Sequence, residues 1–212
     1  RDLVRSRGLG DVYKRQSRGL AVIRAFDGER PRQSLAQVAE ATGLPRATVR
    51  RFLHTLVAEG YAASNGSVFW LTPKTLELGY SYLSGLGLPA IAQPHLDALS
   101  RTLNESCSLT VLDTSDVVYV ARAAANRIMS VNITIGTRFP AYVTSMGRVL
   151  LAGLPPAALD AYLADIALKP FTPKTVTNPD ELKQLLIDVR RQGHCIVDQE
   201  LELGLRLSLI HI

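Results

Sequence analysis

The feature that most constrains this chain is a series of three short helical patterns between residues 17 and 59. The second pattern begins at Ser34, and Gln37 follows three positions later, which is the arrangement of a capping box. It ends at Gly43, and Pro45 suits the first turn of the third helix. Two helices joined by so short a turn predict a helix-turn-helix.

The third helix has two contrasting faces. One face is apolar and predicts the buried side: Val49, Phe52, Leu53, Leu56 and Val57. The other carries small, basic and hydrogen-bonding side chains: Arg46, Ala47, Thr48, Arg50, Arg51, His54 and Thr55. Arginine can contact guanine edges or phosphates, and threonine can contact bases or phosphates. This face is typical of a recognition helix, although a solvated basic helix in a three-helix bundle has a similar pattern.

A β-hairpin is predicted directly after the third helix. Asn65 and Gly66 form a two-residue turn signal between short β-prone runs in residues 61–72. Three helices followed by a hairpin predict a winged helix, whose hairpin tip can touch the DNA backbone or the minor groove. The candidate DNA contacts are Ser34, Arg46, Ala47, Thr48, Arg50, Arg51, His54, Asn65 and Gly66.

The charge of the chain is uneven. Residues 1–74 hold 13 Lys and Arg against 6 Asp and Glu, a net charge of +7, whereas residues 75–212 have a net charge of −2. This asymmetry favours a polyanion as the partner of the first half. Residues 1–16 resemble translated adapter sequence and are expected to be a non-native head, the alternative being a genuine basic arm that reaches DNA. Without them, residues 17–74 still have a net charge of +4.

The composition is that of a globular protein, with 47% hydrophobic and 20% charged residues. No apolar run approaches the roughly 20 residues that a membrane span needs. Cys107 and Cys195 lie far apart and neither belongs to a CxxC pair. Reduced thiols are therefore expected rather than a disulfide or a metal site, which predicts a cytoplasmic protein without a membrane partner.

The second half predicts linker helices followed by an α/β domain. Two helical patterns come first, at residues 75–84 and 89–103. Alternation of apolar and polar residues then predicts three strands, at residues 106–111, 117–121 and 130–135. An amphipathic helix at residues 179–192 ends at Gly193, and the following His194 and Cys195 fit a buried strand better than a pair of metal ligands.

Residues 136–152 are the candidate ligand pocket. Phe139 and Pro140 can supply an apolar wall. Thr144 or Ser145 can cap the next helix, whose free N–H groups and positive dipole end suit a carboxylate. On these residues alone, an ordinary capped helix with a core phenylalanine is the favoured interpretation.

Several long segments match one known family in the same order. They include SLAQVAEATGLPRATVRRFLHTLVAEGY in the first half, and SCSLTVLDTSDVVYVAR, FPAYVTSMGRVLLAGLPP and VDQELELGLR in the second. From Ser17 to Arg206, the sequence resembles the IclR family of bacterial transcription regulators. Within the family, RIMSVNITIGTRFPAYVTSMGRVLLA and FTPKTVTNP resemble the branch that controls catabolism of aromatic acids through the β-ketoadipate route.

The resemblance implies a regulator whose promoter binding is controlled by a small organic acid, either an aromatic acid or a β-ketoadipate pathway intermediate. The implied fold class is α+β: a winged helix-turn-helix at residues 17–74, linker helices at 75–104 and a GAF-like α/β effector domain at 105–206. The implied partners are double-stranded DNA with a palindromic promoter site, the effector, and further copies of the chain in a homodimer or tetramer. No cofactor is implied.

The resemblance also turns residues 136–152 into an effector site. It implies effector contacts from Phe139, Ala141, Thr144, Ser145 and Met146 on one side, and from Asp198, Glu200 and Leu205 on the other. Asp198 and Glu200 could instead be solvated loop charges. If they face the pocket, they would bind effector hydroxyls rather than its carboxylate, because like charges repel.

After Arg206 the sequence departs from the family, in which two more strands and a closing helix follow. Residues 207–212 resemble translated adapter sequence and are expected to be a non-native tail. The effector domain is therefore expected to be truncated and incomplete, with an open sheet edge and exposed apolar surface.

An enzyme built on the α/β half is the rival class. Its acid–base groups would have to come from His95, His194, Cys195, Asp198 and Glu200. None of these belongs to a GxSxG elbow, a P-loop, an HExxH pair or a dinucleotide fingerprint. A module that binds a small molecule without binding DNA is a further alternative. We expect no catalytic residues and no metal site.

Overall fold

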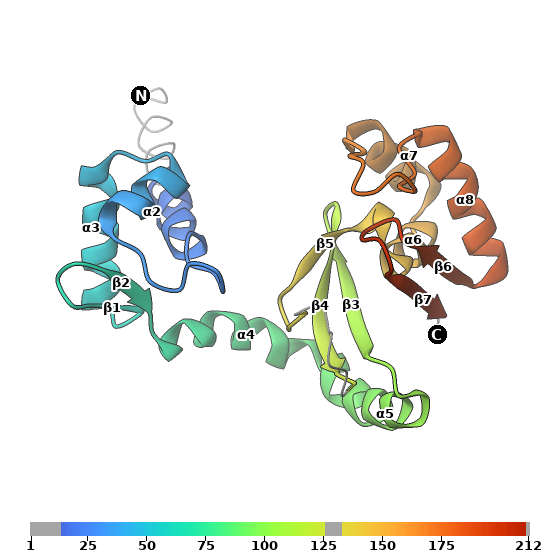
Figure 1. Cartoon of the computed structure of the whole chain (residues 1–212), viewed down its shortest axis with the longest axis horizontal. Coiled ribbons are helices and arrows are strands. Elements are labelled where there is room, and N and C mark those ends of the chain that lie inside the picture. Colours follow the sequence, from blue (N-terminus) through green and yellow to red (C-terminus); the bar gives the residue numbers. More distant parts are fainter. Residues whose placement is uncertain (1–13, 126–132, 211–212) are drawn as a thin grey trace, which may run out of the picture. The chain divides into compact units, whose positions relative to one another are not determined.

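The computed structural model describes residues 14–125 and 133–210. The chain forms two compact units, residues 1–85 and residues 86–212 (Figure 1). Both units combine helices with β-strands, which confirms the predicted mixture of α and β structure with a helix-turn-helix in the first half.

The first unit contains the predicted winged helix. Residues 14–24 are helical. The elements that follow are α2 (Leu35–Thr42), α3 (Arg46–Ala58), β1 (Ala62–Ser64), β2 (Phe69–Leu71), the short 3-10 helix η1 (Pro73–Thr75) and α4 (Leu76–Leu86). Strands β1 and β2 pair in antiparallel register, from Ala62 opposite Leu71 to Ser64 opposite Phe69.

The start of α2 confirms the predicted capping box. The Ser34 hydroxyl accepts a hydrogen bond from the Gln37 backbone N–H, at 3.4 Å, and the Gln37 side chain accepts one from the Ser34 backbone N–H, at 2.8 Å. The helix ends at Gly43, whose φ of 66° lies in the left-handed region that glycine tolerates. These two signals are local, which is why the sequence alone locates the turn between α2 and α3.

We expect Ser34→Ala to lower the free energy of unfolding of the first unit by about 1 kcal/mol, because it leaves helix N–H groups without their cap. Trp70, the single tryptophan of the chain, lies in β2, so its fluorescence during urea unfolding reports on this unit. Ser67→Ala is the matched control, because this exposed serine caps no helix. An Ser34→Ala variant as stable as the control would contradict the capping role.

The core of the first unit joins the three helices to the hairpin. Its buried apolar residues are Val22, Ala25, Val38, Ala39, Val49, Leu53 and Phe69. The sequence analysis did not anticipate Gln33, which is buried and donates a side-chain hydrogen bond to the Ala25 carbonyl at 2.6 Å. Its backbone also pairs with Phe69 on β2, so Gln33 ties the hairpin to the helices.

The hairpin has a longer connection than the sequence predicts. Four residues, 65–68, separate the paired strand ends instead of two. The Asn65 side chain accepts hydrogen bonds from the N–H groups of Ser67 and Val68, at 3.1 and 3.0 Å. Asparagine therefore acts here through its side chain, which satisfies the backbone of a wider loop.

The second unit begins with α5 and contains two separate antiparallel sheets. Its elements are α5 (Leu88–Leu103), β3 (Cys107–Asp113), β4 (Asp116–Ala123), β5 (Arg138–Pro140), the 3-10 helix η2 (Ala141–Val143), α6 (Ser145–Ala152), α7 (Pro156–Asp165), α8 (Pro179–Gln192), β6 (His194–Asp198) and β7 (Arg206–Ile210). One sheet has the order β3-β4-β5, and the other is the β6-β7 pair.

Helix α6 is the centre of the second unit. It contacts α8, both strands of the β6-β7 pair and β3. Seven of its eight residues are buried, an unusual fraction for so short a helix. The core around it includes Val117, Val143, Leu182 and Leu186. The first turn of α6 is therefore enclosed by protein, which matters for any ligand bound there.

The strand predicted at residues 130–135 is wrong where the structure tests it, and residues 130–132 lie outside the described part of the chain. Ile133 and Thr134 have no regular structure, and Ile135 begins a turn and is 54% exposed. The Thr134 backbone donates to the Thr137 hydroxyl at 3.0 Å, and Gly136 has a φ of 89°. A turn with its own hydrogen bonds thus forms in place of the predicted strand, and β5 begins three residues later, at Arg138.

Residues 207–210 form most of β7, although the sequence analysis assigned them to a tail. They pair with β6, from Asp198 opposite Arg206 to His194 opposite Ile210. Leu207 and Leu209 alternate with polar neighbours and pack against the core around α6. The outer edges of β3 and β7 have no strand partner among the described residues. No helix in the described ranges has the length and apolar character of a membrane span.

Candidate nucleic-acid interface and ligand cradle

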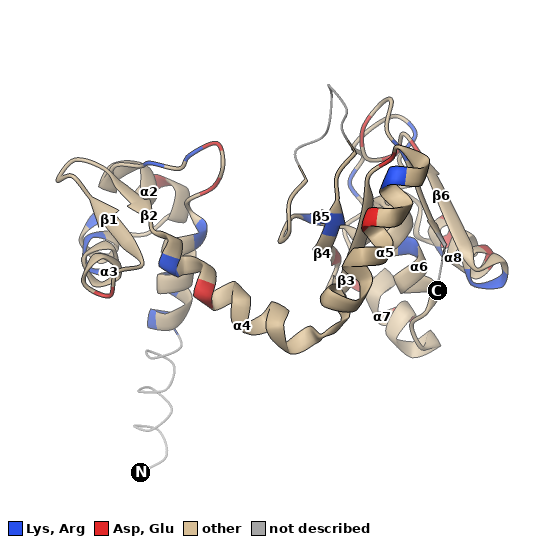
Figure 2. Ribbon diagram, turned by 90° about the horizontal axis from the view of Figure 1, so that it is seen from below, with Lys and Arg blue, Asp and Glu red and all other residues tan. Residues whose placement is uncertain are grey.

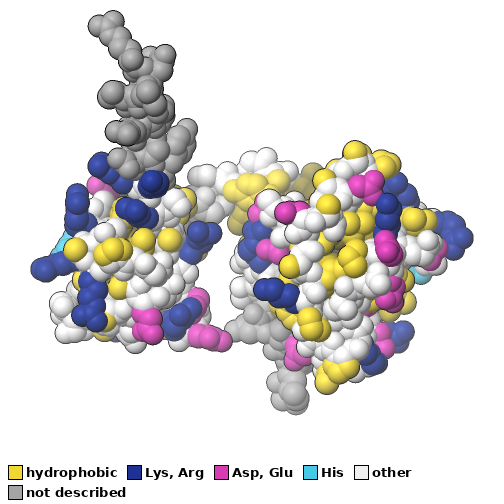
Figure 3. All heavy atoms as spheres, turned by 90° about the horizontal axis from the view of Figure 1, so that it is seen from above, with side chains coloured by type: hydrophobic (Ala, Val, Ile, Leu, Met, Phe, Trp, Pro, Cys, Tyr) yellow, Lys and Arg dark blue, Asp and Glu magenta, His cyan; other side chains and the backbone are white. Residues whose placement is uncertain are grey.

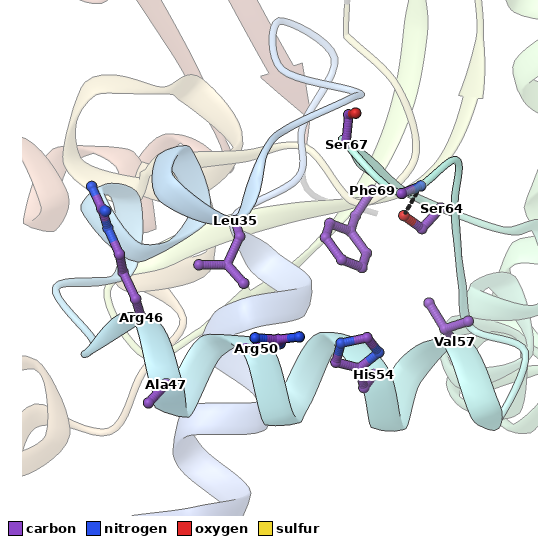
Figure 4. Close-up of a pocket in the computed structure, with 10 residues that line it drawn as sticks. Leu35, Arg46, Ala47, Arg50, His54, Val57, Ser64, Ser67 and Phe69 are labelled. Atoms are coloured by element: carbon purple, nitrogen blue, oxygen red, sulfur yellow. Dashed lines mark hydrogen bonds between the residues drawn. The ribbon is translucent and has the colours of Figure 1, made fainter.

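A groove runs between α3 and the hairpin of the first unit (Figure 4). It encloses about 720 Å³, and Arg46, Arg50 and His54 line its α3 side. These three side chains are four positions apart, so they form one stripe along the helix. Ser64 and Ser67 line the hairpin side. The arginines of this stripe are suited to hold phosphate groups along the groove.

Basic residues recur along α3, where the ribbon is blue in Figure 2. Arg46, Arg50 and Arg51 are exposed, and none of them has an acidic partner among the described residues. Buried Val49 and Leu53 fix the opposite face of the helix in the core. The helix therefore presents its basic side to the outside in a defined orientation.

The predicted DNA contacts are only partly brought together. Ala47 and Gly66 line the same groove as the arginine stripe. Thr48 is half-buried, and Asn65 lies in the hairpin loop with its side chain occupied by the backbone. The Ser34 hydroxyl is engaged with Gln37 at the start of α2 and does not line the groove.

Ser64 and Ser67 of the groove are not among the DNA contacts predicted from the sequence. Ser64 ends β1, and its hydroxyl accepts from the Gly66 N–H at 3.0 Å and donates to the Val68 carbonyl at 2.9 Å. The ring of His54 lies edge-on to Phe69 of β2, with centroids 6.4 Å apart. Serine beside a turn carries little sequence signal, because turns are rich in serine for backbone reasons.

The second candidate site is the turn between η2 and α6. Thr144 caps α6 and accepts a hydrogen bond from the Gly147 N–H at 3.0 Å. Gly147 has no room for a side chain, because a Cβ there would overlap the backbone of Ala141. Close packing of η2 against the first turn of α6 therefore depends on this glycine.

Ser145 is the unusual residue of this turn. Its side chain is completely buried, and its hydroxyl oxygen has no hydrogen-bond partner. A buried hydroxyl without a partner costs free energy, so native proteins rarely retain one without a use for it. It lies in the first turn of α6, where helix N–H groups favour an anion.

Four of the predicted effector contacts meet at this turn. Ala141, Thr144, Ser145 and Met146 are all buried there. Phe139 lies on β5 just before it, and its ring packs edge-on against Tyr119 with centroids 6.0 Å apart. These residues form the ligand cradle, the name used below for residues 139–147.

Asp198, Glu200 and Leu205, the predicted second side of the site, lie in three different environments. Asp198 is exposed at the end of β6 and lies 3.5 Å from the Lys174 ammonium, as a solvated charge would. Glu200 is buried, but its carboxylate binds the Arg148 guanidinium at 2.6 Å. Leu205 is half-buried in the loop before β7. Of the three, Glu200 alone is linked to the cradle, and it is linked through another side chain.

A recess of the second unit lies away from the cradle. It encloses about 620 Å³ between the β3-β4 turn and α7, and its lining includes Leu112, Ser115, Leu154 and Tyr162. None of the predicted effector contacts lines it. The Tyr162 hydroxyl is buried without a partner that meets hydrogen-bond geometry, and burial raises its pKa.

The candidate metal and acid–base residues do not form a metal site within the described part of the chain. Among residues 14–125 and 133–210, no three His, Cys, Asp or Glu side chains are placed to hold a metal ion. His95 is exposed on α5. Cys195 is buried on β6, and burial raises the pKa of its thiol, which disfavours the nucleophilic thiolate.

Comparison with known proteins gives matches over both units. The family model of the IclR helix-turn-helix domain matches residues 17–66, and that of the bacterial transcriptional regulator IclR C-terminal domain matches residues 80–207. A Pca regulon regulatory protein of Pseudomonas putida is 47% identical over 97% of this chain and 71% of its own length.

Solved structures agree with these matches. A protein from Rhodococcus sp. RHA1, described as a transcriptional regulator, is 58% identical over 91% of this chain and 77% of that chain, with a TM-score of 0.79. The inducer-binding domain of a PobR double mutant from Acinetobacter, in complex with 3-hydroxybenzoic acid, is 34% identical over 56% of this chain and 70% of that chain, with a TM-score of 0.52. This chain belongs to the IclR family of bacterial transcriptional regulators.

Proposed function

We propose that this regulator binds promoter DNA through α3 and its hairpin, and that an aromatic carboxylic acid bound at the ligand cradle controls that binding. The observation that best supports binding of an acid is the buried Ser145 hydroxyl in the first turn of α6, which has no hydrogen-bond partner. The proposal that α3 binds DNA is supported by the exposed arginines of this helix beside the groove.

The ligand class is supported by both chemistry and relatives. The first turn of a helix attracts a carboxylate, and the surrounding Ala141, Val143 and Met146 are apolar enough to accept an aromatic ring. The PobR domain that resembles this chain is described in complex with 3-hydroxybenzoic acid. An aromatic acid fits this combination of an anion-binding end and an apolar wall.

The ligand half is tested by thermal unfolding with 3-hydroxybenzoate. We expect the acid to raise the melting temperature, since a ligand at about 100 times its Kd adds about 2.7 kcal/mol to the stability of the native state. The matched control ligand is 3-hydroxybenzyl alcohol, which has the same ring but no carboxylate. An equal shift with acid and alcohol, or no shift with either, would remove this proposal.

Ser145→Ala is the matched protein variant. We expect it to unfold at the wild-type temperature or slightly above, because the hydroxyl it removes has no partner in the free protein. Its Kd for 3-hydroxybenzoate is expected to rise about tenfold, the value of one hydrogen bond to a charged group. Calorimetric titration measures this Kd, and an unchanged value would show that the hydroxyl does not contact the acid.

We also propose that the chain works as a homodimer or larger oligomer on a palindromic site. Each of the two helices exposes large apolar side chains: Leu76, Leu78, Tyr80 and Tyr82 on α4, and, separately, Leu88, Ile91, Leu99 and Leu103 on α5. Hydrophobic side chains at the surface are visible in Figure 3. A second copy of the chain would cover such a surface, and light scattering should then give at least twice the mass of the 23.1 kDa chain. A monomer at micromolar concentration would contradict this.

The remaining features fit a regulator that binds rather than catalyses. DNA is its proposed partner, which makes the cytoplasm the proposed location. We propose residues 17–74 as the DNA-binding domain, 75–104 as the linker and 105–206 as the effector domain, to which the rest of β7 adds residues 207–210. The break between the two compact units, after Gly85, falls within the proposed linker.

A further inference from the structure

A charged side chain lies at the centre of the second unit. Arg148 is on α6 and only 3% exposed. Its Nε donates to the Tyr142 carbonyl at 2.8 Å, and one terminal nitrogen donates to Glu200 Oε2 at 2.6 Å. One guanidinium thus holds the backbone turn that forms the ligand cradle and, at the same time, a residue 52 positions along the chain.

Glu200 is held from a second direction as well. Its Oε2 also accepts the Val176 N–H at 3.1 Å, and its backbone carbonyl accepts the Thr175 hydroxyl at 2.7 Å. The Thr172 hydroxyl donates to the neighbouring Gln199 carbonyl at 2.7 Å. Glu200 therefore joins the segment of residues 172–176 to the segment that leads into β7.

Tyr142 makes a further connection from the cradle to this region. Its hydroxyl donates to the Lys169 carbonyl at 2.7 Å and accepts the Lys169 N–H at 2.8 Å. The carbonyl of the same residue is the one that Arg148 holds. The cradle, the segment of residues 169–176 and Glu200 are thus connected by buried or half-buried hydrogen bonds.

We propose that Arg148 is a positioning residue of the effector site, which acts on the bound acid through the Tyr142 backbone and through Glu200 rather than by touching it. Glu200 then serves as its counter-charge and not as an effector contact. This inference rests on the proposed ligand site. If binding of the acid changes the conformation of the cradle, the Arg148 guanidinium would transmit that change to Glu200 and to residues 172–176.

The geometry requires arginine specifically. The guanidinium presents several N–H donors in a fixed planar fork, so it can bind the Tyr142 carbonyl and the Glu200 carboxylate at once. A lysine ammonium would keep a positive charge opposite Glu200, but it would not reproduce the hydrogen bonds to both the Tyr142 carbonyl and the Glu200 carboxylate. Arg148→Lys keeps the buried positive charge and removes the fork of donors, so it tests the positioning role on its own.

The first test compares Arg148→Lys with the wild-type 212-residue chain by titration with 3-hydroxybenzoate. We expect the Kd to rise at least tenfold while the variant still melts cooperatively. In amide hydrogen exchange without ligand, the Gly147 amide, bonded to Thr144, should exchange at least tenfold faster in the variant. Asp198→Asn is the control, because it removes an exposed charge from the same region and should change neither value.

A second variant covers the case in which Arg148→Lys does not fold. Arg148→Met combined with Glu200→Gln removes both charges, so no unpaired charge stays buried. We expect it to regain wild-type stability but not wild-type affinity for the acid. If Arg148 had only a structural role, the double variant would regain wild-type affinity for the acid together with wild-type stability, and that result would overturn the proposal.

The two proposals fail in different ways. If the wild-type chain binds no aromatic acid, the proposed ligand site is wrong, and hydrogen exchange alone then decides the role of Arg148. An unchanged Gly147 exchange rate in the folded variants would overturn the positioning role. If the wild type binds the acid and the folded variants bind it equally well, only the inference about Arg148 is wrong.

Discussion

DNA binding by this chain is expected to fall about a hundredfold when Arg50 and Arg51 are both replaced by glutamine, since each such contact contributes about 1 to 3 kcal/mol. Both side chains are exposed on α3 and neither has an acidic partner among the described residues. Fluorescence anisotropy with duplexes selected by the chain from a random library measures the effect.

The two single substitutions should affect DNA binding in different ways. Arg50 lines the groove opposite Ser64 and Ser67, so Arg50→Gln should weaken all duplexes alike and lower the salt slope by about 0.9. Arg51 does not line the groove, and Arg51→Gln should relax the preference among sequences. Arg191→Gln, an exposed arginine of α8 paired with Asp188, is the control. Wild-type affinity in the double variant would refute the placement of DNA on α3.

Gly147→Ala is expected to destabilise the second unit by about 3 kcal/mol or more and to abolish binding of the acid. A Cβ at this position would overlap the Ala141 backbone, which cannot move aside as a flexible side chain could. The turn between η2 and α6 would have to open, and that turn is the ligand cradle. Calorimetric unfolding and titration with 3-hydroxybenzoate measure the two losses.

Gly79→Ala is the matched control for this prediction. Gly79 lies within α4, and a Cβ there would meet nothing within 4 Å. Alanine has the higher helix propensity, so this control should be neutral or slightly stabilising. A Gly147→Ala variant that behaves like Gly79→Ala would show that η2 and α6 do not pack as described.

The first unit was largely predictable because its signals are local. Ser34 and Gln37 lie three residues apart, Gly43 marks the end of α2, and apolar spacing gives the buried face of α3. The hairpin was predicted, but its loop length was not. Asn65 satisfies the backbone through its side chain, and the two-residue turn signal does not distinguish that geometry from a tight turn.

The second unit was less predictable because its decisive contacts join distant residues. Arg148 and Glu200 are 52 positions apart, and neither position indicates by itself that the other is its partner. The one sequence signal is Arg148 itself, which is the single charged residue of α6. For residues 133–135 of the predicted strand the reason is local instead: the apolar alternation is real, but hydrogen bonds between Thr134 and Thr137 form a turn there.

The central claim is that an acid at the cradle controls DNA binding by α3. The most direct measurement is the Kd for a selected duplex with and without saturating 3-hydroxybenzoate, at one fixed salt concentration. We predict that the acid changes this Kd by at least about fivefold, the lower end of typical coupling between two sites, and that 3-hydroxybenzyl alcohol leaves it unchanged. The same Kd in all three conditions, in a chain that binds both DNA and the acid, would contradict the account.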